Sequence, residues 1–123
     1  MDQLSSRHRR ALIVEDEIVI ALDLQDAISE MGFDQCDLAS TDRKARSLAM
    51  WVQPDVALVH VCLDGGREGI EAARWLREVC EVPIVFTLER IHEQVPDAPV
   101  LSKPAYRKRL AEAVAEAIEH GIA

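Results

Sequence analysis

Short apolar runs alternate along the chain with longer segments in which apolar residues recur every three or four positions. The short runs predict strands at residues 11–14, 33–38, 56–61 and 84–88. The longer segments predict helices, the last of which carries Leu110, Ala113, Val114, Ala117 and Ile118 on one face. Because strands that alternate with helices form a parallel sheet covered on both faces, the pattern predicts an α/β fold.

The apolar positions within each helix predict the face that packs on the sheet. For the first helix, which Gly32 ends, we expect inward-facing side chains at Ile18, Ala21, Leu22, Ile28 and Met31. For the second helix, which Ser40 or Thr41 caps, we expect them at Ala45, Leu48, Ala49 and Val52. For the third helix we expect them at Ile70, Ala73, Leu76 and Cys80.

Candidate functional residues stand where the predicted strands end. Glu15 and Asp16 follow the first strand, and His60 lies at the end of the third. Leu88 ends the fourth strand, and Ser102 and Lys103 follow a fifth strand. Since right-handed crossovers bring the carboxyl ends of parallel strands to one edge, we expect these side chains to converge there.

Three signals together resemble a known family: the Glu15-Asp16 pair, the third strand that ends in a single presented side chain, and a late Lys103-Pro104. They are similar to the receiver domain of bacterial response regulators in two-component signalling and phosphorelays. The resemblance implies a flavodoxin-like fold over residues 10–120, after a polar tail at residues 1–9. In that fold five parallel strands lie in the order 2-1-3-4-5, with helices on both faces.

The segment 89–99 departs from the family pattern. It contains two prolines and only two apolar residues at helical spacing, Ile91 and Val95. We therefore expect the fourth helix of the fold to be shortened or missing. In the family that helix belongs to a partner-binding face, so the output surface of this chain is expected to differ.

Receivers take a phosphoryl group onto an aspartate at the end of the third strand, with Mg²⁺ held by the acidic pair. The resemblance gives Glu15 and Asp16 the metal role, and it gives Lys103 the role of the phosphate-site lysine. It places His60 at the position of the acceptor aspartate. Loss of that carboxylate weakens the expected Mg²⁺ site, and we expect no firmly bound cofactor.

Two further positions of the family pattern are substituted. Leu88 stands where a hydroxyl reports phosphorylation, and Val100 stands where an aromatic residue precedes the lysine by three positions. Thr87 comes one residue too early. Because neighbouring side chains on a strand point to opposite faces, we expect Thr87 to face away from the site.

Four roles for His60 remain open. In the first, it is a structural imidazole hydrogen-bonded to Glu15 or Asp16. The negative charges of these acids favour the protonated imidazole, which would then do the electrostatic work otherwise done by Mg²⁺. Alternatively it binds a metal with those two acids, a set that suits Zn²⁺ better than Mg²⁺. A third role is phosphorylation of His60 itself. In the fourth, the phosphoryl group goes to a neighbour such as Asp64.

The leading functional prediction is a stand-alone receiver-like module that acts by protein–protein contact without aspartate phosphorylation and is not an enzyme. Its expected partner is a histidine kinase or another signalling protein. One alternative is an active phosphotransfer protein that uses His60 or Asp64. The other is a metal- or ligand-sensing module built on Glu15, Asp16 and His60.

Composition narrows the partners further. The net charge of −8 would repel nucleic acid. Three cysteines without a CxxC spacing fit reduced thiols in the cytoplasm, and we expect Cys62 to be a buried apolar residue. No apolar stretch approaches the ~20 residues that cross a membrane. The oligomeric state does not follow from the sequence.

Overall fold

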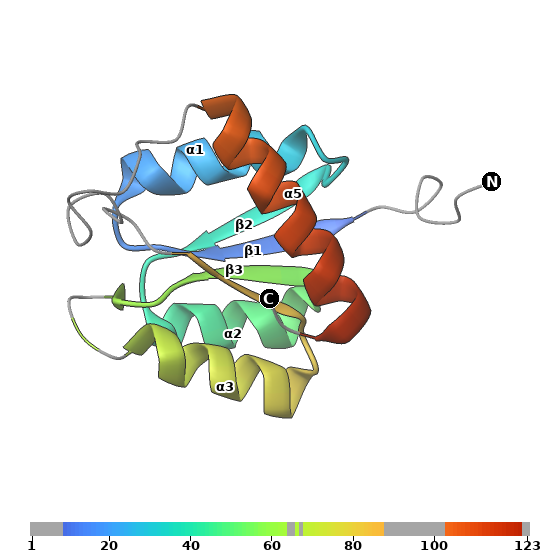
Figure 1. Cartoon of the computed structure of the whole chain (residues 1–123). Coiled ribbons are helices and arrows are strands. Elements are labelled where there is room, and N and C mark those ends of the chain that lie inside the picture. The colour runs from blue at the N-terminus through green and yellow to red at the C-terminus, as the bar shows by residue number, and fades with distance from the viewer. Residues whose placement is uncertain (1–8, 64–65, 67, 88–102, 122–123) are drawn as a thin grey trace.

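The computed structural model describes residues 9–63, 66, 68–87 and 103–121, in which strands and helices alternate (Figure 1). The elements in chain order are β1 (Arg10–Val14), α1 (Ile18–Ser29), β2 (Gln35–Ala39), α2 (Asp42–Val52), β3 (Val56–His60), α3 (Glu68–Cys80), β4 (Ile84–Thr87) and α5 (Lys103–His120). The prediction of an α/β chain is confirmed.

The four described strands form one parallel sheet in the order β2-β1-β3-β4. Strand β1 lies between β2 and β3, so the chain reverses its winding direction there, as the doubly wound order requires. This agrees with the predicted order as far as it extends. The predicted fifth strand and the shortened fourth helix at residues 89–99 lie outside the described residues, as does most of the tail predicted at residues 1–9.

Two apolar clusters cover the two faces of the sheet. Helices α1 and α5 lie over one face, and α2 and α3 lie over the other (Figure 1). Successive side chains of the central strands pack in the two clusters alternately. Ile13 and Leu58 pack toward α1 and α5, whereas Val14 and Val59 pack toward α2 and α3. A strand that is buried on both faces reads as a continuous apolar run, which explains the clear signal of β1 and β3.

Helix α1 buries a different face from the one predicted. Its buried residues are Ala21, Leu24, Ala27 and Ile28. Ile18 and Leu22, which were expected to face inward, are 61% and 50% exposed. At about 100° per residue Leu22 lies roughly 160° around the helix from Leu24, so the two cannot face the same layer. The prediction for Ile18 and Leu22 is wrong.

Smaller corrections apply to the other helices. Ile70 in α3 is 40% exposed and Ile118 in α5 is 38% exposed, although both were expected to face inward. Phe33 was assigned to a strand, but β2 begins at Gln35, and Phe33 instead closes the turn after α1 by a 3.4 Å hydrogen bond from its N–H to Ile28 O. Thr41, one of the two predicted caps, caps α2.

Candidate functional site

The carboxyl ends of the described strands bring a small group of polar side chains together. Glu15 and Asp16 follow β1, and His60 is the last residue of β3. One ligand atom from each of the three residues lies within 4.8 Å of the others. The predicted convergence of these three residues is confirmed.

The backbone around Glu15 fixes the position of its carboxylate. The N–H of Glu15 donates to Ala39 O at 3.0 Å, which extends the β1–β2 pairing one residue past the strand. The N–H of Glu17 then donates to Glu15 Oε2 at 3.1 Å, so the carboxylate folds back over the start of α1. Glu15 is only 3% exposed, whereas Asp16 beside it is exposed.

His60 is 2% exposed and lies between β1 and β4. Its Nδ1 is 3.3 Å from Thr87 O, to which it donates when that nitrogen carries the proton. The same Nδ1 is 4.0 Å from Glu15 Oε1, a distance of ion-pair length that is too long for a hydrogen bond. A carbonyl of β4 and the buried carboxylate of Glu15, directly after β1, therefore both face the imidazole.

Thr87 lies beside His60 and not on the opposite face as predicted. The two residues are register partners in the β3–β4 pair. Val85 and Leu58, each two residues earlier, pack in the same apolar cluster, so Thr87 and His60 share that face. Thr87 Oγ1 is buried and has no hydrogen-bond partner among the described residues. The prediction was wrong because it took the fourth strand to end one residue later, at Leu88.

Gly69 holds the start of α3 against the end of β3, a contact that sequence reasoning missed. A Cβ at this position would lie 1.9 Å from His60 O and 2.7 Å from Val61 O. Only a residue without a side chain allows so close an approach of helix and strand. The available signal was a glycine within a helical segment, where it is less favourable than alanine.

Two of the three thiols, those of Cys36 and Cys80, have a raised pKa. Burial raises the pKa of the Cys36 thiol to about 11, and the charge of Asp37 adds to the effect. Burial also raises the pKa of Cys80. Cys62 is exposed, so the prediction that it is buried is wrong: it lies past the end of β3, where the chain has left the sheet.

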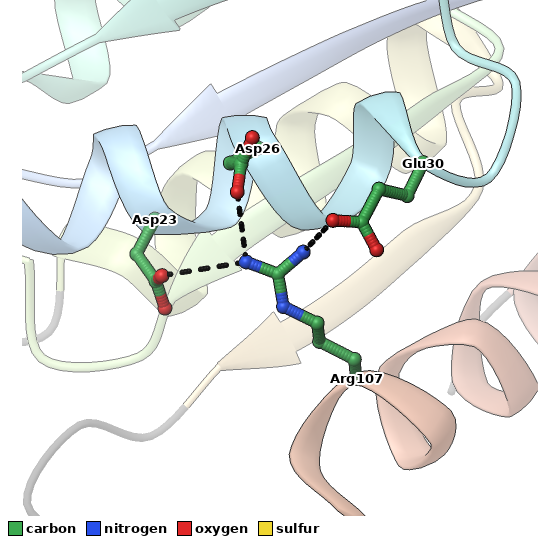
Figure 2. Close-up of polar contacts among 4 residues, drawn as sticks. All are labelled: Asp23, Asp26, Glu30 and Arg107. Atoms are coloured by element: carbon green, nitrogen blue, oxygen red, sulfur yellow. Dashed lines mark hydrogen bonds and ion pairs between the residues drawn. The ribbon is translucent and has the colours of Figure 1, made fainter. Parts of the chain in front are cut away.

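An ion-pair cluster that sequence reasoning also missed joins α5 to α1 (Figure 2). Arg107 reaches from α5 to two carboxylates on α1 and to that of Glu30, the C-cap residue of the same helix. Its Nη2 lies 2.9 Å from Asp26 and 3.7 Å from Asp23, and its Nη1 donates to Glu30. These hydrogen bonds raise the pKa of Arg107. Acidic residues spaced three and four apart on α1 were the available signal.

Several predicted site residues lie outside the described part of the chain. These are Asp64, Leu88 and Val100, together with the side chain of Lys103. Helix α5 begins at Lys103, so Pro104 stands in its first turn, where a proline fits a helix. No helix in the described residues is both long and apolar enough to cross a membrane.

A comparison with protein-family models finds no match. Among curated proteins, the chain is 32% identical over 98 residues to the transcriptional regulatory protein PdtaR of Mycobacterium tuberculosis, across 76% of this chain and 47% of that protein. The chain thus spans about half the length of this relative.

Solved structures match over nearly the whole chain. The signal receiver domain of a modulated diguanylate cyclase from Desulfovibrio desulfuricans has a TM-score of 0.72 and 28% identity, covering 92% of this chain and 95% of that one. The PhyR response regulator REC domain of Erythrobacter litoralis also has a TM-score of 0.72, with 24% identity and 92% coverage of both chains. At that identity the second likeness concerns the fold alone.

Proposed function

The chain is a response-regulator receiver domain of two-component signalling, and from this premise we propose that it signals by protein–protein contact without aspartate phosphorylation. The observation that carries the proposal is the buried imidazole of His60 at the end of β3. The resemblance places the phosphoryl-accepting carboxylate of receivers at this position. An imidazole cannot form the acyl phosphate on which that chemistry depends.

The surroundings of His60 support a structural role. An in-line phosphoryl transfer needs a nucleophile whose lone pair is open to the donor. His60 is 2% exposed and its Nδ1 faces Thr87 O. The neighbouring Glu15 is just as buried, and the Glu17 N–H holds one of its oxygens. We therefore propose that His60 fixes one arrangement of this edge, which in other receivers changes with phosphorylation.

Helix α1 supplies the proposed contact surface. Ile18, Val19 and Leu22 are 61%, 76% and 50% exposed and occupy its first turns, directly after the site. Large apolar side chains grouped on the solvent face of one helix favour a partner that covers them. Farther along the helix, Asp26 and Glu30 pair with Arg107 and remain exposed, and together with Asp23 they outnumber its single positive charge, so the net charge there is negative. The surface suits an apolar partner helix with basic residues at one end.

We propose a histidine kinase or another signalling protein as the partner. The test of the contact is binding of a purified histidine kinase to the chain and to the variant Val19→Ser. The variant should bind at least tenfold more weakly, because it removes an exposed anchor. Met50→Ser is the matched control, since Met50 is 62% exposed on α2 and should leave the affinity unchanged. Equal loss in both variants would contradict the assignment to α1.

The alternative function, phosphotransfer through His60, has a distinct signature. After incubation with acetyl phosphate and Mg²⁺, phosphohistidine is labile in acid, whereas an aspartyl phosphate is labile in base. Intact-mass spectra should show no added phosphoryl group on the chain. An acid-labile label that disappears in His60→Ala would establish the alternative instead. A base-labile label lost in Asp64→Ala would identify Asp64 as the acceptor.

A further inference from the structure

We propose that Glu15, Asp16 and His60 form a binding site for a divalent transition-metal ion of the Zn²⁺ type and discriminate against Mg²⁺. The ion that the site selects does not depend on whether any residue of the chain takes a phosphoryl group.

The donor set does not fit Mg²⁺. This ion requires near-octahedral oxygen ligands at about 2.0–2.1 Å and is usually held by carboxylates and water. The cluster offers two carboxylates and one imidazole nitrogen. Nitrogen is a preferred ligand of Zn²⁺, which is commonly bound by histidine together with carboxylate oxygens. Replacing a carboxylate by an imidazole therefore changes the class of ion that the edge selects.

The spacing of the donors fits a tetrahedral ion after a small movement. With metal–ligand distances near 2.0–2.2 Å, tetrahedral ligands lie about 3.3–3.6 Å apart. Nδ1 of His60 is 4.0 Å from Glu15 Oε1, and all three donors lie within 4.8 Å of one another. Closing the first distance takes about half an ångström, and closing a separation of 4.8 Å takes a little over one ångström, movements that rotation of the carboxylate side chains provides.

A hydrogen bond beside the site orients the Glu15 carboxylate. The Glu17 N–H holds Glu15 Oε2, which leaves Oε1 on the side of His60. Thr87 O lies 3.3 Å from the same Nδ1, so Nδ1 gives up this contact when its lone pair binds the ion. Asp16 is exposed while the other two ligands are buried, so an ion can enter from its side.

Thr87 provides an observation that is independent of the three ligands. Its Oγ1 is buried without a hydrogen-bond partner among the described residues, and Thr87 pairs with His60 in the sheet. A buried hydroxyl without a partner loses its hydrogen bonds to water and gains none in exchange. Three protein ligands leave Zn²⁺ one position for a water. A water bound there would give the hydroxyl a partner.

The test is calorimetric titration of the chelator-treated, tag-free chain with Zn²⁺, Mn²⁺ and Mg²⁺, combined with the shift in Tm. We expect one equivalent of Zn²⁺ to bind and to raise Tm, and at least a hundredfold weaker binding of Mg²⁺. His60→Gln and Asp16→Asn should each weaken Zn²⁺ binding at least tenfold. Asp16 is exposed, so its variant remains informative if His60→Gln does not fold.

The matched control is His120→Gln. His120 is exposed and its Nε2 lies 3.6 Å from Glu119 Oε1, so the variant removes a surface imidazole outside the proposed site. Zn²⁺ binding should persist in this variant. Loss of binding there, unchanged binding in Asp16→Asn, absence of any Zn²⁺ binding, or a preference for Mg²⁺ would each overturn the proposal. His60→Asp should reverse the selectivity, because it returns an oxygen donor to the site.

Discussion

Replacing Gly69 with alanine tests how α3 is held against the end of β3. The added methyl group would lie 1.9 Å from His60 O, whereas non-bonded contacts of a Cβ essentially never fall below 3.0 Å. Helix and strand must therefore separate by about one ångström. Both close atoms, His60 O and Val61 O, belong to the backbone, so no side-chain rotation relieves the clash.

Two opposing effects set the expected magnitude. Overpacking of this kind destabilises a protein by about 1–3 kcal/mol. Alanine gains about 1 kcal/mol over glycine inside a helix. The clash against backbone is severe enough to place the first effect at or above the top of its range. We therefore expect Gly69→Ala to lower the free energy of unfolding by about 2 kcal/mol or more.

The assay is urea denaturation followed by circular dichroism, with Gly66→Ala as the control. A Cβ at Gly66 would meet nothing within 4 Å, so that variant should be near neutral. In Gly69→Ala the imidazole resonances of His60 should also shift, because its own carbonyl is displaced. A Gly69→Ala protein as stable as the wild type or more so would refute this account of the contact.

Three further predictions concern the rest of the fold. Thr41→Ala should lose about 1 kcal/mol in urea denaturation, because Thr41 Oγ1 accepts from the Lys44 N–H at 3.1 Å; no loss would contradict its role as a cap. Arg107→Ala should lower Tm at low salt and much less at about 1 M NaCl, where ion pairs are screened. Arg109→Ala, which removes an exposed arginine of the same helix, should leave Tm unchanged at both salt concentrations. In alkylation at pH 8, Cys62 should react well before Cys36, because the raised pKa of Cys36, about 11, leaves roughly 0.1% of it as thiolate. Cys36 should react as fast as Cys62 only as the pH approaches 11. Early modification of Cys36 at pH 8 would contradict its burial.

The sequence was sufficient where one physical rule decided the outcome. Strands buried on both faces read as apolar runs, so β1 and β3 and the convergence of Glu15 with His60 were predictable. Helix faces were harder, since Ile18 and Leu22 are as apolar as the buried Leu24. Exposed apolar residues of a helix and buried apolar residues of the core look alike in a sequence.

Contacts that depend on register or close approach could not be predicted. Thr87 was placed on the wrong face because its direction depends on pairing with His60, and a one-residue difference in register reverses it. The approach of Gly69 to His60 O depends on how a helix sits against a strand. The Arg107 cluster joins residues more than seventy positions apart, which no local pattern encodes.

The central claim is that the chain signals by contact and not by aspartate phosphorylation. The most direct measurement is the Kd for a purified histidine kinase before and after incubation of the chain with acetyl phosphate and Mg²⁺, with the intact mass recorded on the same samples. We predict an unchanged mass and an unchanged Kd. A stoichiometric, base-labile phosphoryl group on the chain, accompanied by a change in Kd, would contradict the account.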